Sequence, residues 1–149
     1  MKKYANEFSM FVTGEPKPQA RPRFARVGNF VKTYSPKSVF FALVHNEAVL
    51  KGPALPMLGP LSLKLQFYMP RPLALQRGKG AARVWHESRP DLDNMEKAVM
   101  DAMTQARVWN DDGQVCEKSS AKVLAPIDGE QRPGVFVWVA QILDVEGVE

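Results

Sequence analysis

Two groups of acidic residues lie close together in an otherwise basic chain. The first contains Asp91 and Asp93, two residues apart, and the second is the pair Asp111 and Asp112. Carboxylate oxygens are the ligands that Mg²⁺ prefers, and few are needed because the ion keeps several of its waters. Lys97 follows Asp93 by one turn of a helix, so its ammonium could hold a phosphate or stabilise charge in a transition state. The pattern predicts a divalent-metal site that acts on a phosphate ester.

Hydrolysis of a phosphodiester is the reaction that such a site suits. At neutral pH it needs a deprotonated water, neutralised phosphate oxygens and a stabilised leaving alkoxide, and a divalent metal can supply all three. Asp91 and Asp93 can converge on one ion from an extended segment or from the start of a helix. A third carboxylate from the loop at Asp111–Asp112 closes the site if the fold brings that loop back.

Each of these residues also has a structural interpretation. Asp93 is a plausible N-cap of the helix that follows it, and Lys97 and Asp101 have the i, i+4 spacing of a solvent-exposed ion pair. Asp112 precedes a glycine, which is an ordinary turn signal, and Asp111 could be a turn residue beside it. No single element is specific, and it is their density between Arg89 and Asp112 that favours the metal site.

The basic residues are concentrated in two stretches. The stretch from Lys17 to Lys37 contains six basic residues and no acidic residue. The stretch from Pro70 to Pro90 contains five basic residues and one acidic residue, and the net charge of the chain is +4. Both stretches are rich in Gly and Pro, which predicts loops. Basic loops on a globular body are typical of nucleic-acid binding, although they also serve general solubility. Trp85 and Trp109 flank the acidic motif, where they could stack on bases or belong to the core.

The periodicity of apolar residues predicts one α+β domain over residues 1–149, with a mixed β-sheet and two main helices packed on it. Ser35 and Pro36 are expected at the N-cap and first position of the first helix, and Asp93 at the N-cap of the second. The expected elements are strands at 8–12, 61–69, 115–124 and 135–143, and helices from 35 to about 51 and from about 94 to 106.

The second expected helix has two different faces. An apolar face with helical spacing is formed by Met95, Ala98, Val99, Ala102 and Ala106. Asp93, Lys97 and Asp101 fall on the opposite side, at about 100° per residue. The charged residues should therefore form a stripe that points away from the core.

The cysteine content and the apolar runs of the sequence predict a protein of the reducing cytoplasm. Cys116 is the single cysteine, so no intrachain disulfide can form; we expect its side chain to be at least half-buried. The N-terminal residues lack the apolar core of a signal peptide, and no apolar run approaches the roughly 20 residues that span a bilayer. We therefore expect a cytoplasmic protein with no membrane partner.

The two acidic groups, taken with their neighbours, resemble the RusA family of Holliday junction resolvases from bacteria and their phages. The resemblance is carried by Arg89–Ala102, which reads RPDLDNMEKAVMDA, and by Trp109–Val115, which reads WNDDGQV. Three shorter segments are also similar to phage-type members of the family: Gly14–Pro16, Arg21–Arg23 and Thr33–Pro36.

This resemblance implies an endodeoxyribonuclease with a RusA-like fold that resolves Holliday junctions by paired symmetric nicks during DNA recombination and repair. It implies a homodimer that cuts branched DNA with Mg²⁺, or Mn²⁺ in its place, and no small-molecule cofactor. By the same resemblance Asp91, Asp93 and Asp112 are the catalytic metal ligands and Lys97 is the catalytic lysine. Asp101 and Asp111 fall beside these residues as possible accessory groups.

The basic loops are expected to hold the DNA backbone. The residues assigned to this role are Arg21, Arg23, Arg26, Arg71, Arg77, Lys79 and Arg83. One alternative is a non-catalytic protein that binds branched DNA and whose acidic cluster is structural. Another is an enzyme that uses Asp-x-Asp to bind a nucleotide–metal complex, but the chain has no Gly-rich nucleotide-binding loop.

Overall fold

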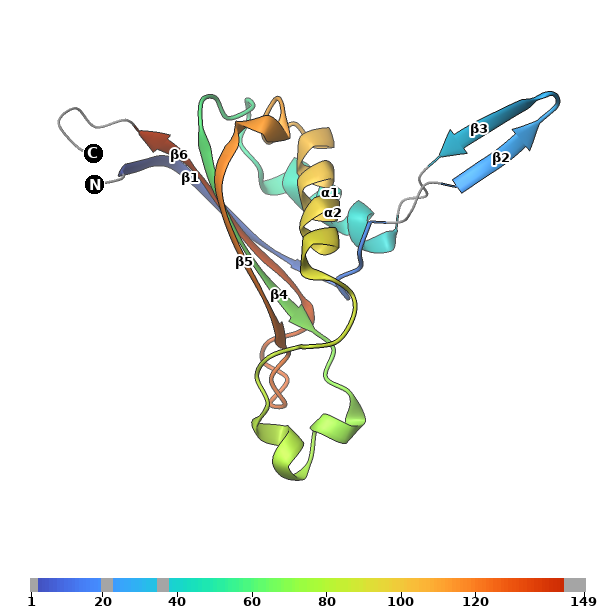
Figure 1. Cartoon of the computed structure of the whole chain (residues 1–149). Coiled ribbons are helices and arrows are strands. Elements are labelled where there is room, and N and C mark those ends of the chain that lie inside the picture. Colours follow the sequence, from blue (N-terminus) through green and yellow to red (C-terminus); the bar gives the residue numbers. More distant parts are fainter. Residues whose placement is uncertain (1–2, 20–22, 35–37, 144–149) are drawn as a thin grey trace.

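The computed structural model describes residues 3–19, 23–34 and 38–143, and it shows an α+β fold (Figure 1). Three short 3-10 helices, η1 (Leu73–Leu75), η2 (Gly78–Ala82) and η3 (Asp112–Gln114), lie in the connections. The main elements are β1 (Lys3–Thr13), β2 (Arg23–Val27), β3 (Phe30–Tyr34), α1 (Val39–Lys51), β4 (Leu61–Met69), α2 (Leu92–Gln105), β5 (Val115–Leu124) and β6 (Gly134–Leu143).

Four strands form the main sheet in the order β1-β6-β4-β5. β6 runs antiparallel to both β1 and β4, whereas β4 and β5 are parallel. Parallel neighbours need a crossover connection, and here the crossover contains α2. β5 is the last strand in this order and is therefore an edge strand of the sheet.

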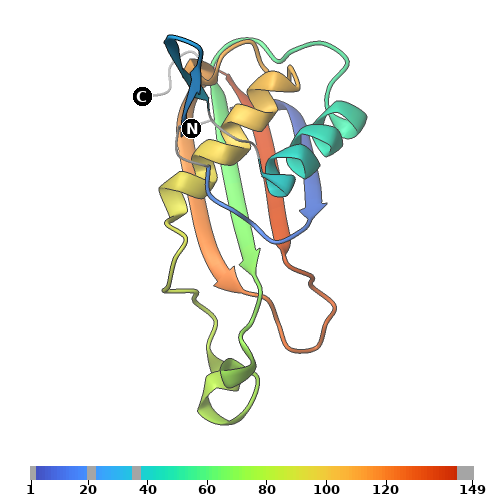
Figure 2. The same ribbon diagram turned by 90° about the vertical axis from the view of Figure 1, so that its right-hand side faces the viewer.

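Both helices cover the same face of this sheet (Figure 2). β4 matches its predicted range, and its alternation is visible in the structure, because Leu63, Leu65 and Phe67 are buried whereas Lys64 is exposed. The buried side chains of α1 and α2, among them Phe40 and Val99, belong to the same hydrophobic core. The predicted mixed sheet with two helices packed on it is confirmed.

The helix starts differ from the prediction. α1 begins at Val39, and its N-cap is Ser38, whose hydroxyl accepts a hydrogen bond from the Phe41 N–H at 3.1 Å. Ser35 and Pro36, the expected start, lie outside the described residues. α2 begins at Leu92 with Asp91 at the N-cap position, so the prediction that Asp93 is the N-cap is wrong.

The first basic stretch is not a simple loop. Residues 23–34 form a two-stranded hairpin, β2–β3, with Val27 paired to Phe30 across the turn. Gly28, at the first turn position, has φ of +60°, which favours glycine in a two-residue hairpin turn. The hairpin extends away from the main sheet (Figure 1), and Val27, Phe30 and Val31 are exposed on it.

The remaining connections agree with the predicted irregular segments. Residues 52–60 and 125–133 contain no long element, and β5 and β6 begin within one residue of their expected starts. Cys116 is exposed, contrary to expectation. No helix in the described ranges is long and apolar enough to cross a membrane.

The turn after α2 is anchored by a buried tryptophan. Trp109 is fully buried, and its indole N–H donates a hydrogen bond of 2.7 Å to the hydroxyl of Thr104. That hydroxyl donates in turn to the carbonyl of Met100 at 2.8 Å. The tryptophan thereby fixes the chain that leads from α2 to Asp111 and Asp112.

Replacing Thr104 by Val should destabilise the protein, because the buried indole N–H of Trp109 loses its acceptor. An unsatisfied buried donor costs about 1–3 kcal/mol, so the free energy of unfolding measured in urea should fall by that amount. Thr13→Val is the matched control, since Thr13 is exposed at the end of β1. Equal effects of the two substitutions would contradict the role given to Thr104.

Candidate active site

The first acidic group lies at the start of α2. Asp91 occupies the N-cap position, yet its side chain makes no capping hydrogen bond. Asp93 lies in the first turn, where its Oδ1 accepts the N–H of Asn94 at 3.0 Å. Both residues are exposed, and among the described residues no cation pairs with either carboxylate. The helix N-terminus favours negative charge here, and both carboxylates face solvent at this end of α2.

The start of α2 and the chain before it are held in place from two sides. The ammonium of Lys122, on β5, donates hydrogen bonds to the carbonyls of Ser88 and Pro90. The N–H of Gln19 donates to the carbonyl of Asn94 at 3.3 Å. These bonds fix the position of Asp91 relative to the sheet.

A hollow of about 730 Å³ lies beside Asp91, between the segment before the hairpin and the start of α2. Its lining consists of Glu15, Lys17, Pro18, Gln19, Arg89, Pro90, Asp91 and Asn94. Lys17 is paired with Glu15 at 3.2 Å, whereas Arg89 is exposed. The hollow therefore combines an acidic edge with an exposed guanidinium, which suits a phosphate bound next to a cation.

Lys97 and Asp101 follow Asp93 at intervals of one turn. Lys97 is exposed, as the predicted charged stripe requires, whereas Asp101 is half-buried. These two described residues do not form an ion pair with each other, so the i, i+4 pair that the spacing allows is not made. The ammonium of Lys97 remains available to a phosphate near Asp93.

The second acidic group is divided between two roles. Asp111 is the N-cap of η3, where its side chain accepts the N–H of Gln114 and the Gln114 side chain accepts the N–H of Asp111 in return. Gln114 also donates to the carbonyls of Met57 and Gly59, which ties this loop to the linker before β4. Asp111 is thus a structural cap, whereas Asp112 is exposed beside it.

The fold does not bring Asp112 back to Asp91 and Asp93 within one chain. α2 has 14 residues, so its ends are about 21 Å apart at 1.5 Å per residue. The path along β5 gives a similar separation of the two acidic groups. Pro90 is bound by Lys122 near the end of β5, whereas Asp112 lies just before the start of the strand. Among the described residues, no three His, Cys, Asp or Glu side chains are grouped closely enough to hold a metal.

The pair Asp91 and Asp93 nevertheless has the chemistry of a Mg²⁺ site. Mg²⁺ is commonly held by one or two carboxylates, with waters and substrate phosphates as its other ligands. Both residues are exposed at one helix start, and neither carboxylate serves as the helix cap. These two residues fit the ion as a partial ligand set, and Asp112 of the same chain cannot complete that set.

Comparison with known proteins is consistent with this arrangement. A model of the family described as "Endodeoxyribonuclease RusA" matches residues 13–140, which include both acidic groups, the hairpin and both helices. The chain belongs to the RusA family of endodeoxyribonucleases. Its enzymatic class follows from this membership.

Two curated proteins are similar to this RusA-family chain. "Crossover junction endodeoxyribonuclease rusA" of Lactococcus phage r1t is 46% identical over 39 residues, which is 26% of this chain and 30% of that protein. "Uncharacterized protein YqaN" of Bacillus subtilis (strain 168) is 28% identical over 142 residues, 88% of this chain and 94% of that protein.

Glu96 is a part of the site region that the sequence analysis missed. Its side chain is only 10% exposed, on the side of α2 that faces β5. Oε2 accepts a hydrogen bond of 2.6 Å from Ser120, and Oε1 lies 3.7 Å from the ammonium of Lys118. A buried carboxylate is stable only when it is paired and hydrogen-bonded, so this contact holds α2 against β5. Its position beside Met95 in the apolar arc of the helix is the signal that could have found it.

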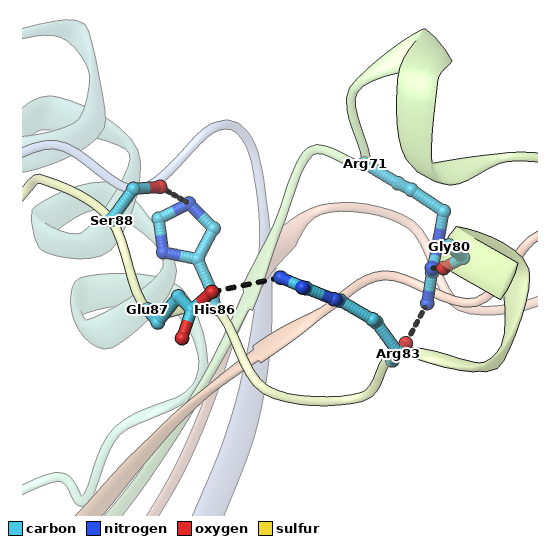
Figure 3. A network of polar contacts seen from close by, with 6 residues as sticks. All are labelled: Arg71, Gly80, Arg83, His86, Glu87 and Ser88. Atoms are coloured by element: carbon cyan, nitrogen blue, oxygen red, sulfur yellow. Dashed lines mark hydrogen bonds and ion pairs between the residues drawn. The ribbon is translucent and has the colours of Figure 1, made fainter.

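The second basic stretch of this RusA-family protein forms a lobe, defined here as residues 70–88, that is built around Arg71 (Figure 3). The guanidinium donates to four backbone carbonyls, those of Ala125, Leu75, Gly80 and Arg83, at 2.7–3.1 Å. Arg71 is half-buried. The sequence analysis assigned it to DNA, but its donors are engaged within the protein, so its role is to close the lobe.

The other basic residues assigned to DNA lie on two projections. Arg77 and Lys79 are exposed on the lobe, as is Arg83, whose guanidinium contacts Glu87 at 2.8 Å (Figure 3). Arg26 is exposed on the hairpin. Arg23 begins β2, and Arg21 lies outside the described residues.

The two tryptophans and His86 differ in their surroundings. Trp109 belongs to the core, whereas Trp85 is 66% exposed on the lobe next to β5. His86 is half-buried, and its Nε2 lies 3.4 Å from the hydroxyl of Ser88 (Figure 3). Burial lowers the pKa of His86 below its usual 6.5, and the neighbouring Lys122 lowers it further.

Replacing Arg71 by Lys should loosen the lobe, because an ammonium cannot reach four carbonyls that surround a planar guanidinium. The lost hydrogen bonds are each worth about 1 kcal/mol. Hydrogen exchange of the Leu75, Gln76 and Arg83 amides should therefore accelerate by at least about 10-fold. Arg77→Lys, at an exposed position of the same lobe, should leave these amides unchanged. Unchanged exchange in Arg71→Lys would contradict the closing role.

The lowered pKa of His86 predicts a loss of stability in mild acid. The unfolded chain takes up this proton near pH 6.5, whereas the folded chain takes it up only at lower pH. The contribution of neutral His86 to the free energy of unfolding is therefore complete above pH 6.5, and it declines as the pH falls toward the folded-state pKa. His86→Gln should show a smaller drop in Tm than the wild type between about pH 7.5 and pH 5. His45→Gln, at the other histidine of the chain, is the control. Parallel profiles for the wild type and His86→Gln would disprove this assignment.

Proposed function

We propose that this protein is a Mg²⁺-dependent endodeoxyribonuclease that resolves Holliday junctions by paired symmetric nicks, as a homodimer, in DNA recombination and repair. Membership of an endodeoxyribonuclease family supports a DNA substrate. The local similarity to a phage protein named a crossover junction endodeoxyribonuclease supports a junction in particular. The observation that carries the proposal is the pair of exposed carboxylates, Asp91 and Asp93, with an exposed Lys97 one turn further on.

The metal would be held by Asp91 and Asp93. Mg²⁺, or Mn²⁺ in its place, would supply a hydroxide at neutral pH and neutralise charge on the phosphate. Asp112 is the third ligand expected from the sequence, and in one chain it lies at the far end of α2.

The other residues near this pair would bind and orient the phosphate. The ammonium of Lys97 would bind a non-bridging phosphate oxygen and stabilise the charge that develops there. The guanidinium of Arg89, beside the hollow, would bind the backbone with its planar donor fork. Both side chains are exposed, so they can meet DNA without a change of fold.

The two projections would hold the arms of the junction. Arg77, Lys79 and Arg83 on the lobe and Arg26 on the hairpin place positive charge at two separate places beyond the main sheet. Contacts of this kind follow the phosphate backbone and weaken steeply with salt. Two separated basic arms suit a branched substrate better than a straight duplex.

A homodimer follows from the symmetry of the substrate. A four-way junction is two-fold symmetric and must be cut on two opposing strands. An isologous dimer would place two identical sites on those strands. The enzyme would act in the cytoplasm, where bacterial and phage DNA is found.

The alternative is a protein that binds branched DNA without cutting it. To separate the two, the purified protein is incubated with a labelled four-way junction and a matched linear duplex, with Mg²⁺ and with chelator. The proposed function predicts symmetric, Mg²⁺-dependent nicks confined to the junction. Binding to the junction without nicks would support the alternative.

Asp93→Asn should abolish cleavage but keep junction binding. The amide retains the size of the side chain and removes its charge, so the metal is lost while the basic projections are unchanged. We expect a loss of at least about 100-fold in the cleavage rate and an unchanged dissociation constant in a gel-shift assay.

Asp128→Asn is the matched control for this change. Asp128 is exposed in the turn between β5 and β6, where its Oδ1 accepts the N–H of Glu130, a bond that an amide oxygen can also make. This variant should cleave like the wild type. Retained cleavage in Asp93→Asn would count against the proposed site.

A further inference from the structure

The main sheet of this protein has one face that the helices leave open. Both α1 and α2 pack on the other face (Figure 2), where Leu63, Leu65 and Phe67 of β4 belong to the core. Successive side chains of a strand point to opposite faces of a sheet, so the residues between these three point away from the helices. We propose that this open face binds single-stranded DNA by stacking its bases on aromatic side chains. The inference goes beyond the proposed function, because it requires neither the metal nor cleavage.

Aromatic side chains gather at the centre of the open face. Phe11 of β1 is paired with Phe136 of β6, and Trp138 lies two residues further along β6. Tyr68, on β4, belongs to the same side of the sheet. We call the surface that these four residues form the aromatic face. Phe136 is 40% exposed and the other three are half-buried. Phe136 and Trp138 are about 7 Å apart along the strand, so each ring can receive one base.

The rings of the aromatic face are held in place by their neighbours. A Cβ on Gly134 would lie 2.8 Å from the Phe11 ring, so the glycine leaves the space that this ring occupies. The Tyr68 ring lies 6.1 Å from the Phe11 ring, centroid to centroid. The ring of Tyr4 meets Trp138 edge-on at 5.3 Å. Rings that are fixed before binding lose little conformational entropy when a base stacks on them.

A polar hollow of about 320 Å³ adjoins Phe136. Its lining includes Lys64, Gln66 and Ser119. The ammonium of Lys64 lies 5.0 Å from the centroid of the Trp138 ring, a cation–π position that keeps it on the aromatic face. The amide of Gln66 has both donors and an acceptor for the edge of a base. The hollow therefore offers a ring, an amide and a cation to one nucleotide.

The charges of the open face favour a polyanion as its occupant. Lys64 is exposed and lies in register with Trp138 of β6. Glu117 lies near the start of β5, where its Oε1 accepts hydrogen bonds from the hydroxyls of Tyr4 at 2.8 Å and Ser62 at 2.7 Å. The ammonium thus meets solvent, whereas the carboxylate is engaged within the protein. An apolar partner would have to bury this ammonium at a cost in free energy, whereas a phosphate pairs with it.

The aromatic face continues toward the basic lobe. Trp85 forms an antiparallel bridge with Val123 of β5, which is itself paired with Tyr68. Residues directly opposite each other in a sheet point to the same face, so Trp85 extends the aromatic face beyond β5. It is 66% exposed, and Arg77 and Lys79 of the lobe are exposed as well. A single strand that crosses the aromatic face toward β5 is thereby led to the cations of the lobe.

This combination suits a single strand better than a duplex. A four-stranded sheet that presents aromatic side chains is a known platform for stacking two or three unpaired bases. The bases of a duplex are stacked on one another, so they cannot reach such rings. Asp91 and Asp93 lie at the start of α2, on the side of the sheet that the helices cover. The aromatic face and the two carboxylates would therefore hold different segments of DNA.

Fluorescence anisotropy with a labelled oligothymidylate of about 15 nucleotides tests this site in a buffer with chelator. The wild type should bind it, and Phe136→Ala should bind at least about 5-fold more weakly, because a stacked base is lost. Phe136→Tyr keeps a ring and should bind like the wild type. Leu50→Ala, at an exposed position of α1, is the matched control and should also bind normally. Equal affinities of the wild type and Phe136→Ala, or no binding by the wild type, would overturn the inference.

Lys64→Gln tests the phosphate contact separately. Loss of one phosphate contact to a single strand should reduce the slope of log affinity against log salt concentration by about 0.7. Lys51→Gln, at an exposed lysine of α1 that pairs with Glu47, should leave the slope unchanged. The same slope in the wild type and Lys64→Gln would refute the role given to Lys64.

Two further measurements identify the occupant. The fluorescence of 2-aminopurine placed in the oligonucleotide should fall on binding to the wild type, because the base stacks, and should fall less with Phe136→Ala. Sedimentation of both proteins shows whether the aromatic face is instead a contact between two copies of the chain. A lower dimer fraction in Phe136→Ala, with unchanged affinity for the oligonucleotide, would assign the face to a second copy and overturn the inference.

The two proposals fail in different ways. If the wild type binds the oligonucleotide through Phe136 but does not cut junctions, the proposed function fails and the single-strand site stands. If the wild type cuts junctions but does not bind the oligonucleotide, the function stands and the single-strand site fails.

Discussion

The parallel pairing of β4 with β5 is the constraint on which the rest of the structure depends. Parallel strands cannot be joined by a tight turn, so the chain returns along α2, across the face of the sheet. Whatever the sequence places before and after this helix is therefore carried to opposite ends of the molecule. The separation of the acidic groups is a direct result of this topology.

The same crossover explains why the buried contacts around α2 are polar as well as apolar. Met95, Val99 and Met103 pack into the core, but the side of the helix that faces the edge strand meets β5 through Glu96 and Ser120. Lys122 adds a second polar anchor, to the carbonyls before the helix. These bonds fix the direction of the helix at the edge of the sheet, where the core no longer covers it.

Much of the fold could be predicted from the sequence, because its signals are local. The alternation along β4 gives both ends of that strand, and the apolar spacing of α2 separates its buried and charged faces. The hairpin was missed because its basic residues obscured a short Gly28–Asn29 turn signal. The roles of Arg71 and Glu96 depend on carbonyls and hydroxyls distant in sequence, which no local pattern contains. The positions of the carboxylates at one helix start were predictable, but the location of Asp112 was not, because only the tertiary path of the chain decides it.

The closure of the lobe by Arg71 makes the shape of this DNA-facing segment independent of the geometry of the carboxylates. Its four hydrogen bonds join the lobe to itself and to the end of β5, and none of them reaches the start of α2. The part of the lobe closed in this way, residues 71–83, can change in length and sequence while the sheet and the carboxylates stay in place. Related enzymes could therefore exchange this lobe as a unit, and the shape of the DNA that is held could diversify without any change in the chemistry that cuts it.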